Sequence, residues 1–273
     1  MLLITTSVVN NPLFIEIQYM TLKKFVKNPF KYVVYNDAKS WKEFSNHYDE
    51  NVRNDISSLC SKLNIECINI NNEHHKKLDI TNNPSTRAAE SCNHMLKDHI
   101  ESNTKTIQFD SDMFLIDYLD IEEKYKECEL AIIPQHRVDR DTGLDINYAW
   151  NGLAYFDMPL VKNKHLLNWD SIPHTDCGGA FHNYFINTPD ASMRKINHLS
   201  SGSWNKNDFP ENINKNILNF LENDPKNVNG KYFAELYDDI FLHYRAGGNW
   251  MLESKELHDN RTKLLWDSIV SII

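Results

Sequence analysis

The chain has 273 residues and a formal net charge of −9; 25% of its residues are charged and 41% are hydrophobic. A chain of this size buries enough surface to fold without disulfides or a structural metal, and its acidic balance without a basic stripe argues against binding to duplex nucleic acid. Glycine is scarce, with 8 residues and none before Gly143, which excludes the glycine-rich phosphate loops of dinucleotide-binding and P-loop proteins from the first half.

The first 115 residues alternate between short apolar runs and segments in which apolar side chains recur at helical spacing. Pro12 follows two asparagines and is well placed to start the first helix. Strands separated by helices of about 10 to 15 residues predict an α/β fold with a mostly parallel sheet and helices on both faces. We expect strands at 2–9, 32–35, 65–70 and 106–109, and helices at 13–26, 49–63 and 85–100.

The periodicity weakens after residue 116. The segment 130–134 predicts a strand, whereas 147–156 is aromatic and mixed in pattern. No repeat or low-complexity linker divides the chain, so we expect a single large domain over 1–273. Helices are expected at 160–169, 213–221, 232–240 and at the C-terminal end.

Polar side chains lie at or near the carboxyl ends of three of the predicted strands. Ligands of open α/β sheets bind outside the carboxyl ends of the strands. These side chains are therefore candidates for one binding site. They are Thr5 and Thr6, Asn36 and Asp37, and the run Asp110, Ser111 and Asp112.

Asp110 and Asp112 form a D-x-D triplet at the end of the fourth strand. Residues two apart on a strand point to one face, so the two carboxylates repel each other unless a divalent cation lies between them. An acidic protein that handles an anionic substrate commonly needs such a cation. A helix cap or a solvated loop is the alternative reading of this triplet.

The segment 241–250 reads F-L-H-Y-R-A-G-G-N-W. His243 is a suitable ligand for Mn²⁺ beside carboxylates, and Arg245 is suited to pairing with phosphate oxygens. Gly247 and Gly248 permit a close approach of the backbone to a ligand. A histidine satisfied within the core is the alternative for His243.

Several residues between these motifs are further candidates. Asp176 lies in the run H-T-D-C-G-G at 174–179, either as a general base or as a turn residue. Trp150 and Asn151 suit sugar binding or a plain aromatic core. Arg87 is a candidate for contact with a nucleotide base or a phosphate; the alternative is an arginine on the protein surface.

These features together resemble nucleotide-sugar glycosyltransferases of the GT-A fold. The resemblance covers roughly 1–116, which contains the D-x-D motif, and 241–250. The latter segment is similar to the H-Y-x-G-x-x-K-P-W stretch of glycogenin-like transferases, in which the histidine binds the metal. Here the stretch is one residue shorter, and Asn249 stands where lysine is expected; Arg245 is the candidate replacement.

The resemblance implies a nucleotide-sugar-binding half at 1–116 and an acceptor-binding half at 117–273 with a helical C-terminal segment. It implies Mn²⁺ or Mg²⁺ bound by Asp110, Asp112 and His243, and it places Asp176 on the acceptor side. Retaining and inverting reactions are both open; in an inverting reaction Asp176 would be the base that deprotonates the acceptor hydroxyl. The implied donor contacts are Thr5, Thr6, Asp37, Arg87, Asp110, Ser111, Arg245, Gly247 and Gly248. The implied acceptor contacts are Trp150, Asn151, His174, Gly178 and Gly179.

The expected activity is transfer of a sugar from a nucleoside-diphosphate donor, UDP-sugar by default, to a glycan or another hydroxyl acceptor. A non-catalytic sugar- or nucleotide-binding protein on a transferase scaffold is one alternative. A sugar-phosphate nucleotidyltransferase is another, although such enzymes resemble each other in a glycine-rich loop that is replaced here by Asn10, Asn11 and Pro12.

The five cysteines are scattered and form no C-x-x-C motif. Reduced thiols in a cytoplasmic protein are therefore expected. The apolar start of the chain, 1–9, is too short to span a bilayer, so no integral membrane segment is expected.

Overall fold

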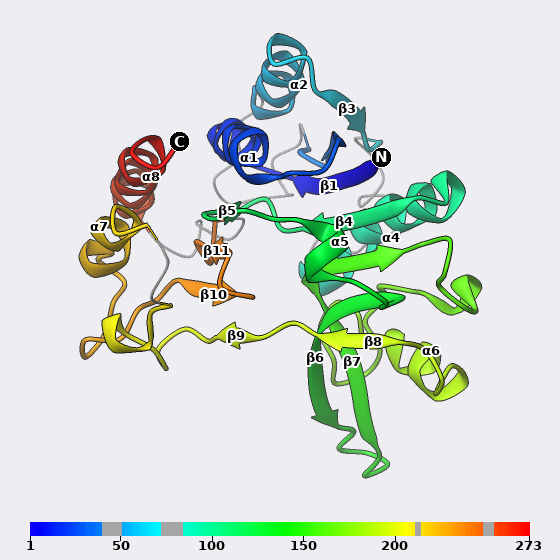
Figure 1. The fold of residues 1–273 in the computed structure, drawn as a ribbon. Helices are drawn as coiled ribbons and strands as arrows, with labels where there is room; N and C mark the ends of the chain where they lie inside the picture. Colours follow the sequence, from blue (N-terminus) through cyan, green and yellow to red (C-terminus); the bar gives the residue numbers. More distant parts are fainter. Residues whose placement is uncertain (40–50, 72–83, 211–213, 248–253) are drawn as a thin grey trace.

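The computed structural model describes residues 1–39, 51–71, 84–210, 214–247 and 254–273. Its centre is a seven-stranded sheet with the strand order β3-β2-β1-β4-β7-β6-β8 (Figure 1). All neighbouring strands run parallel except β4 with β7 and β6 with β7. The strands are β1 (Leu2–Val8), β2 (Phe30–Asn36), β3 (Glu66–Asn69), β4 (Lys105–Phe109), β6 (Leu130–Val138), β7 (Asp145–Asp157) and β8 (Met193–Lys195).

Helices cover both faces of this sheet, as the alternating pattern predicts. The strand β2 shows the division: Tyr32 and Val34 join the core beneath α1 and α2, whereas Val33 and Tyr35 join the core beneath α4 and α6. The mostly parallel α/β arrangement is confirmed. The helices are α1 (Pro12–Phe25), α2 (Val52–Lys62), α4 (Pro84–Ser102), α5 (Ile121–Lys124), α6 (Phe181–Asn187), α7 (Ile217–Asn223) and α8 (Lys255–Val270).

The start of α1 follows from its local sequence. The side chain of Asn11 accepts a hydrogen bond from Leu13 N at 3.1 Å and caps the helix. Pro12 occupies the first helical position, where its missing N–H costs nothing. The short connection from β1 therefore returns the chain over the sheet at once.

A second sheet lies beside the first and consists of four antiparallel strands in the order β5-β11-β10-β9. In Figure 1 it lies between the central sheet and the pair formed by α7 and α8. One apolar core runs through both sheets and includes Ile4, Phe14, Leu242 and Leu265, so the two halves of the chain form a single α/β domain. The strands are β5 (Met113–Leu115), β9 (His198–Leu199), β10 (Glu235–Tyr237) and β11 (Phe241–His243).

The sequence predictions fail mainly after residue 116. The segment 147–156 belongs to the long strand β7, and 160–169 contains one short 3₁₀ turn, η2 (Lys164–Leu166), in place of a helix. The helix expected at 232–240 is wrong, because these residues form β10 between β9 and β11 and then a turn. Asp238 and Asp239 in that turn have φ of 48° and 65°, which no right-handed helix allows.

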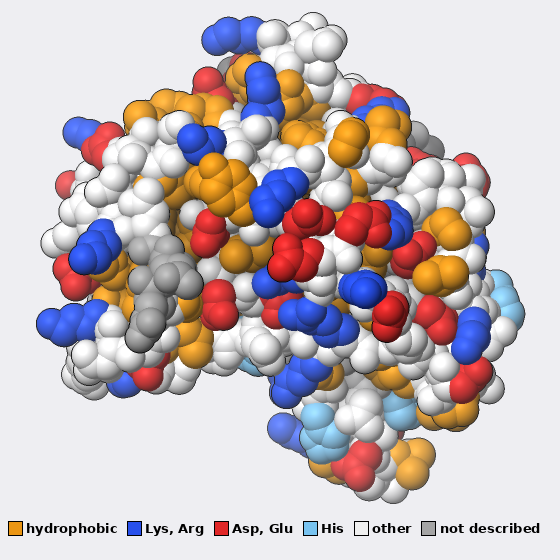
Figure 2. Space-filling model, viewed as in Figure 1, with side chains coloured by type: hydrophobic (Ala, Val, Ile, Leu, Met, Phe, Trp, Pro, Cys, Tyr) orange, Lys and Arg blue, Asp and Glu red, His pale blue; other side chains and the backbone are white. Residues whose placement is uncertain are grey.

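The predicted C-terminal helix is found as α8, and the helix expected at 213–221 is found in part, since α7 begins at Ile217 and residue 213 lies outside the described residues. A further 3₁₀ turn, η3 (Lys206–Asp208), precedes α7. Within the described ranges, none of the helices has the length and apolar character needed to cross a membrane. Figure 2 shows acidic and basic side chains interspersed over the visible face, without a broad basic field.

Candidate functional site

The D-x-D triplet forms the turn that joins β4 of the central sheet to β5 of the small sheet. Gln18 of α1 is fully buried and clamps this turn, because its Nε2 donates to the carbonyls of Asp110 at 2.8 Å and Met113 at 3.0 Å. Tyr32 donates in turn to Gln18 Oε1 at 2.5 Å. The turn is therefore anchored from α1 and β2 before any ligand binds.

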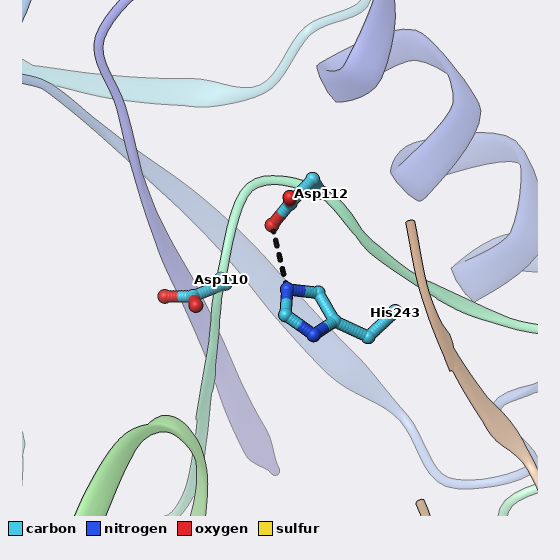
Figure 3. Close-up of side chains that lie close together, drawn as sticks. All are labelled: Asp110, Asp112 and His243. Carbon is cyan, nitrogen blue, oxygen red and sulfur yellow. Dashed lines mark ion pairs between the residues drawn. The ribbon is translucent and has the colours of Figure 1, made fainter. Parts of the chain in front are cut away.

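His243 reaches the same turn from the end of β11. Its Nε2 lies 3.2 Å from Asp112 Oδ1, and both side chains are almost completely buried. Figure 3 shows these two groups facing each other, with Asp110 at the end of the preceding strand. Asp110, Asp112 and His243 each offer one ligand atom, and the three atoms lie within 4.8 Å of one another.

Burial and mutual charge alter the ionisation of all three groups. Burial, and then the charge of Asp112, raise the pKa of Asp110 to about 7. Burial also favours the neutral form of Asp112, but the charge of His243 and hydrogen bonds from His243 and Gly247 outweigh it and lower that pKa. Burial lowers the pKa of His243, yet Asp112 and Glu235 outweigh it and raise that pKa to about 10.

The donor set fits a divalent cation. Two carboxylates and an imidazole are ligands that Mn²⁺ accepts, and Mg²⁺ binds through the carboxylates. The partly buried Asp110 and the buried Asp112 bring two carboxylates close together, and a cation relieves the repulsion between such groups. The three residues implied by the resemblance are therefore brought together in a geometry suitable for a metal.

The chain after His243 folds back onto Asp112. Tyr244 N donates to Asp112 O at 2.8 Å, and Gly247 N donates to Asp112 Oδ2 at 2.7 Å. A Cβ at Gly247 would lie 2.5 Å from Asp112 Cβ and from a ring carbon of Phe14. Only glycine allows this approach, so the backbone at Gly247 packs directly against the turn formed by Asp110, Ser111 and Asp112. Gly248 lies outside the described residues.

Glu235 of β10 is a member of this cluster that the sequence analysis missed. Its Oε2 lies 2.9 Å from His243 Nδ1 and accepts a hydrogen bond from the Tyr237 hydroxyl at 2.8 Å. Burial raises the pKa of Glu235, but the hydrogen bond and charge of His243 dominate and lower it to about 2. A strand predicted at 235–237 would have placed the side chains of Glu235 and Tyr237 on the same face, because residues two apart on a strand point in the same direction.

Trp150 is brought to the cluster by an irregularity in β7. The pairing of β6 with β7 shifts between Ile132 and Ile133, and Ile133 pairs with Trp150. The Trp150 ring stacks on Tyr237 at 5.4 Å and lies 5.4 Å from the His243 ring. A Cβ at Gly152 would lie 2.0 Å from the indole, so this glycine makes room for it.

Asn151 lies in the same irregular part of β7 but points toward a cysteine. Its backbone oxygen accepts a hydrogen bond from Gln108 Nε2 at 3.2 Å, and its Nδ2 lies 3.7 Å from Cys92 Sγ. The five cysteines are all free in the structure.

The residues expected to contact the nucleoside are largely buried. Thr5 and Thr6 are completely buried, and Thr5 Oγ1 lies 2.9 Å from His99 Nε2. Asp37 accepts a hydrogen bond from Ser91 Oγ at 2.6 Å and pairs with Lys39 at 2.5 Å.

Arg87, Ser111 and Arg245 are the remaining residues that the resemblance assigned to the donor. Burial lowers the pKa of Arg87 and outweighs the charge of Asp37, which acts in the opposite direction. Ser111 is buried within the acidic turn. Arg245 donates from Nη1 to Ser201 Oγ at 2.9 Å and lies over the Phe233 ring.

The residues around Asp176 lie against the β6–β7 hairpin. Asp176 is exposed and forms an ion pair with Arg137 at 3.5 Å. His174 Nε2 lies 3.1 Å from Asp141 Oδ2, and with Asp139 these side chains make a second, more exposed group of three possible metal ligands. The structure thus gives Asp176 and His174 partners outside the Asp112–His243 cluster.

The two glycines of this segment serve close packing. A Cβ at Gly178 would lie 2.0 Å from the Ala149 carbonyl oxygen, and one at Gly179 would lie 1.9 Å from Thr175 Oγ1. Gly178 also has a φ of 96°, which residues with a side chain rarely adopt. Both positions therefore require glycine for the fold, independently of any acceptor.

Comparison with known proteins adds no relative: no protein-family model and no curated protein matches this sequence.

Proposed function

We propose that this protein is a metal-dependent glycosyltransferase of the GT-A type. It would transfer a sugar from a nucleoside-diphosphate donor, with UDP-sugar as the first donor to test, to a glycan or another hydroxyl acceptor. The observation that carries the proposal is the cluster of the partly buried Asp110 with the buried Asp112 and His243, whose ligand atoms lie within 4.8 Å of one another.

The position of this cluster in the fold supports the proposal. The D-x-D turn follows β4, whose carboxyl end lies at the same edge of the sheet as those of β1 and β2. Open α/β sheets bind their ligands at this edge. The first half of the chain has no glycine, so a cation is the suitable means of holding a diphosphate here.

A bound Mn²⁺ or Mg²⁺ would supply positive charge where the departing nucleoside diphosphate becomes negative, an effect worth several kcal/mol. The protein's own residues hold that site in place. Gln18 fixes the acidic turn, and Gly247 N–H restrains the Asp112 carboxylate. Trp150 covers one side of the His243 ring.

The direct test is a panel of nucleotide sugars with Mn²⁺, read as donor hydrolysis and as melting temperature. Nucleoside diphosphate with Mn²⁺ should raise the melting temperature, because ligand binding to the folded state stabilises it. Asp112→Asn should remove this shift, and Asp267→Asn, an exposed carboxylate of α8, should keep it. Absence of stabilisation by every common nucleoside diphosphate in the presence of metal would contradict the proposal.

Donor hydrolysis also separates the alternatives. A non-catalytic binding protein would be stabilised by the nucleotide sugar without hydrolysing it. A nucleotidyltransferase would instead release pyrophosphate from a nucleoside triphosphate. After β1 the chain enters the Asn11 cap of α1 directly, which does not favour the glycine-rich loop of that class.

The acceptor base is tested separately. Asp176→Ala should abolish transfer while sparing donor binding if Asp176 deprotonates the acceptor hydroxyl. Retained transfer would assign Asp176 to its ion pair with Arg137 alone.

A further inference from the structure

We propose that Glu235 is the positioning residue of the metal site, which holds the His243 imidazole so that Nε2 is offered to the cation. This inference rests on the metal site of the proposed function and concerns a residue outside the D-x-D and His-Tyr motifs. Two contacts, one on each ring nitrogen, carry it: Glu235 Oε2 lies 2.9 Å from His243 Nδ1, and His243 Nε2 lies 3.2 Å from Asp112 Oδ1.

The contact with Glu235 determines which imidazole nitrogen is available. An ionised carboxylate only accepts hydrogen bonds, so Nδ1 must carry a hydrogen when it bonds to Glu235. The nitrogen with a lone pair in the neutral ring is then Nε2, which faces Asp112. Metal-bound histidines in proteins commonly have such a carboxylate behind the ring, where it fixes both tautomer and orientation.

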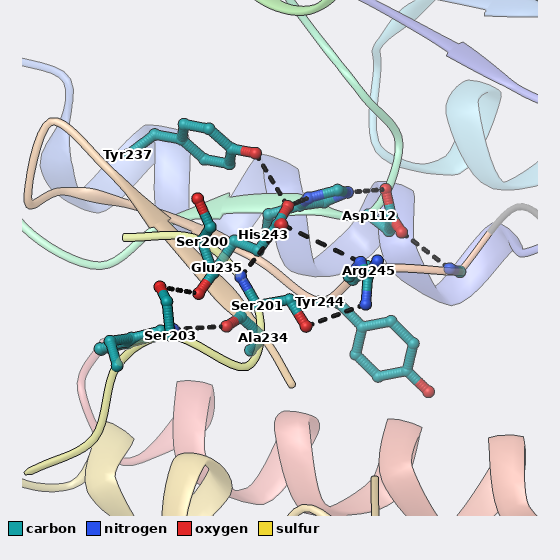
Figure 4. Close-up of polar contacts among 12 residues, drawn as sticks. Asp112, Ser200, Ser201, Ser203, Ala234, Glu235, Tyr237, His243, Tyr244 and Arg245 are labelled. Atoms are coloured by element: carbon teal, nitrogen blue, oxygen red, sulfur yellow. Dashed lines mark hydrogen bonds and ion pairs between the residues drawn. The ribbon is translucent and has the colours of Figure 1, made fainter. Parts of the chain in front are cut away.

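The carboxylate of Glu235 is itself held from three segments of the chain. Tyr237 of the same strand donates to Oε2 at 2.8 Å, and Ser201 N donates to Oε1 at 3.2 Å. Arg245 Nε lies 3.9 Å from Oε1. Figure 4 shows these groups converging on Glu235 from β10, the 200–203 loop and the chain after β11. A carboxylate restrained in this way cannot follow a rotating ring, so it sets the ring's orientation.

Glu235 acts through His243 and does not belong to the ligand set. The three ligand atoms that lie within 4.8 Å of one another come from Asp110, Asp112 and His243, and Glu235 contacts the nitrogen on the other side of the ring. Its ion pair with Arg245 is long, and the arginine side chain is 44% exposed, so this pair contributes little to the fold. Of the two charged partners of Glu235, His243 is thus the main one.

The test is Mn²⁺ binding to the full chain without nucleotide, measured as free Mn²⁺ by electron paramagnetic resonance. Glu235→Gln keeps the size of the side chain but removes its charge, and it should weaken Mn²⁺ binding about 10- to 100-fold. Tyr237→Phe keeps the ring that stacks on Trp150 and removes one hydrogen bond to Glu235; it should weaken binding by a smaller factor. Glu123→Gln, an exposed carboxylate of α5, is the matched control and should bind like the wild type.

The imidazole-nitrogen coupling of bound Mn²⁺ gives a readout that a merely structural role would not change. Wild type should show the coupling, and Glu235→Gln at saturating Mn²⁺ should show it altered or lost while its metal-free melting curve stays cooperative. Unchanged affinity and coupling in Glu235→Gln would overturn the inference. If that variant does not fold, wild-type affinity in Tyr237→Phe would overturn it instead.

The same samples separate this inference from the proposed function. Wild-type protein that hydrolyses a donor, with Glu235→Gln binding Mn²⁺ normally, contradicts only the role of Glu235. Wild-type protein that binds Mn²⁺ through an imidazole but neither binds nor hydrolyses any donor contradicts only the transferase. A wild type without affinity for Mn²⁺ contradicts both.

Discussion

Arg261 of α8 and Asp224, which follows α7, form a buried, bidentate ion pair. Nε donates to Oδ1 at 2.8 Å, and Nη2 donates to Oδ2 at 2.9 Å. The same Nη2 donates to the Tyr244 carbonyl at 2.9 Å, and the guanidinium lies 4.0 Å from the centre of the Tyr244 ring. The C-terminal helix is thereby tied to the residue that directly follows His243.

Removing one partner of this pair should strongly destabilise the protein. Arg261→Met leaves the Asp224 carboxylate buried and uncompensated, which should lower the free energy of unfolding by about 3–5 kcal/mol. Lys255→Met breaks an exposed pair with Asp259 on the same helix and should cost less than about 0.5 kcal/mol. Urea denaturation measures both, and equal losses in the two variants would refute the structural role of Arg261.

Gly247→Ala should disturb the acidic turn. The added Cβ would lie 2.5 Å from Asp112 Cβ and from Phe14, and overpacking of this kind costs about 1–3 kcal/mol. We also expect weaker Mn²⁺ binding, by tenfold or more, because Gly247 N–H would move away from Asp112 Oδ2.

Gly230→Ala is the matched control for this prediction. Its φ is 71°, and a Cβ there meets no atom within 4 Å. It should therefore lose about 1 kcal/mol of stability from backbone strain, without any change in Mn²⁺ affinity. Isothermal titration of both variants with Mn²⁺ decides whether the close approach of Gly247 matters for the site.

The buried imidazole of His99 predicts a loss of stability in acid. Burial lowers the pKa of His99 from 6.5 to about 3, so between these values the unfolded chain binds a proton that the folded chain does not. Stability from this group is complete above pH 6.5 and falls as the pH falls toward 3, by about 1.4 kcal/mol per pH unit.

Denaturation curves between pH 7 and pH 4 measure this effect. His99→Gln removes the titrating group but keeps a side chain that can hydrogen-bond to Thr5 Oγ1, which lies 2.9 Å from His99 Nε2. Its stability should therefore depend less steeply on pH than that of the wild type. Parallel curves for the two proteins would show that His99 titrates normally in the folded state.

Chelation should remove activity without unfolding the protein. The apolar core runs through both sheets and does not depend on a metal, so EDTA-treated protein should keep its cooperative melting curve. Returning Mn²⁺ at 100 times its dissociation constant should add about 2.7 kcal/mol of stability and restore donor hydrolysis. Hydrolysis that persists at full rate after complete chelation would contradict the metal-dependent mechanism.

The parallel half of the fold was predictable because its signals are short-range. Apolar runs such as Leu2–Val8 and the Asn11–Pro12 helix start act within a few residues. The second half was less predictable, since 235–237 becomes a strand only by pairing with β9 and β11. Because the sequence pattern predicted a helix at 232–240, Glu235 was not recognised as a neighbour of His243.

The α/β class, and Asp110, Asp112 and His243 as candidate ligands, could be recognised in the amino-acid sequence, because periodicity and residue type are local properties. The pairing of β5 with β11, which places His243 Nε2 3.2 Å from Asp112 Oδ1, is visible in the folded chain alone. The tertiary structure likewise placed Glu235 behind His243 and Gly247 against Asp112. These contacts join residues as many as 135 positions apart, and such approaches are set by the pairing of strands that are distant in the sequence, which no local pattern encodes.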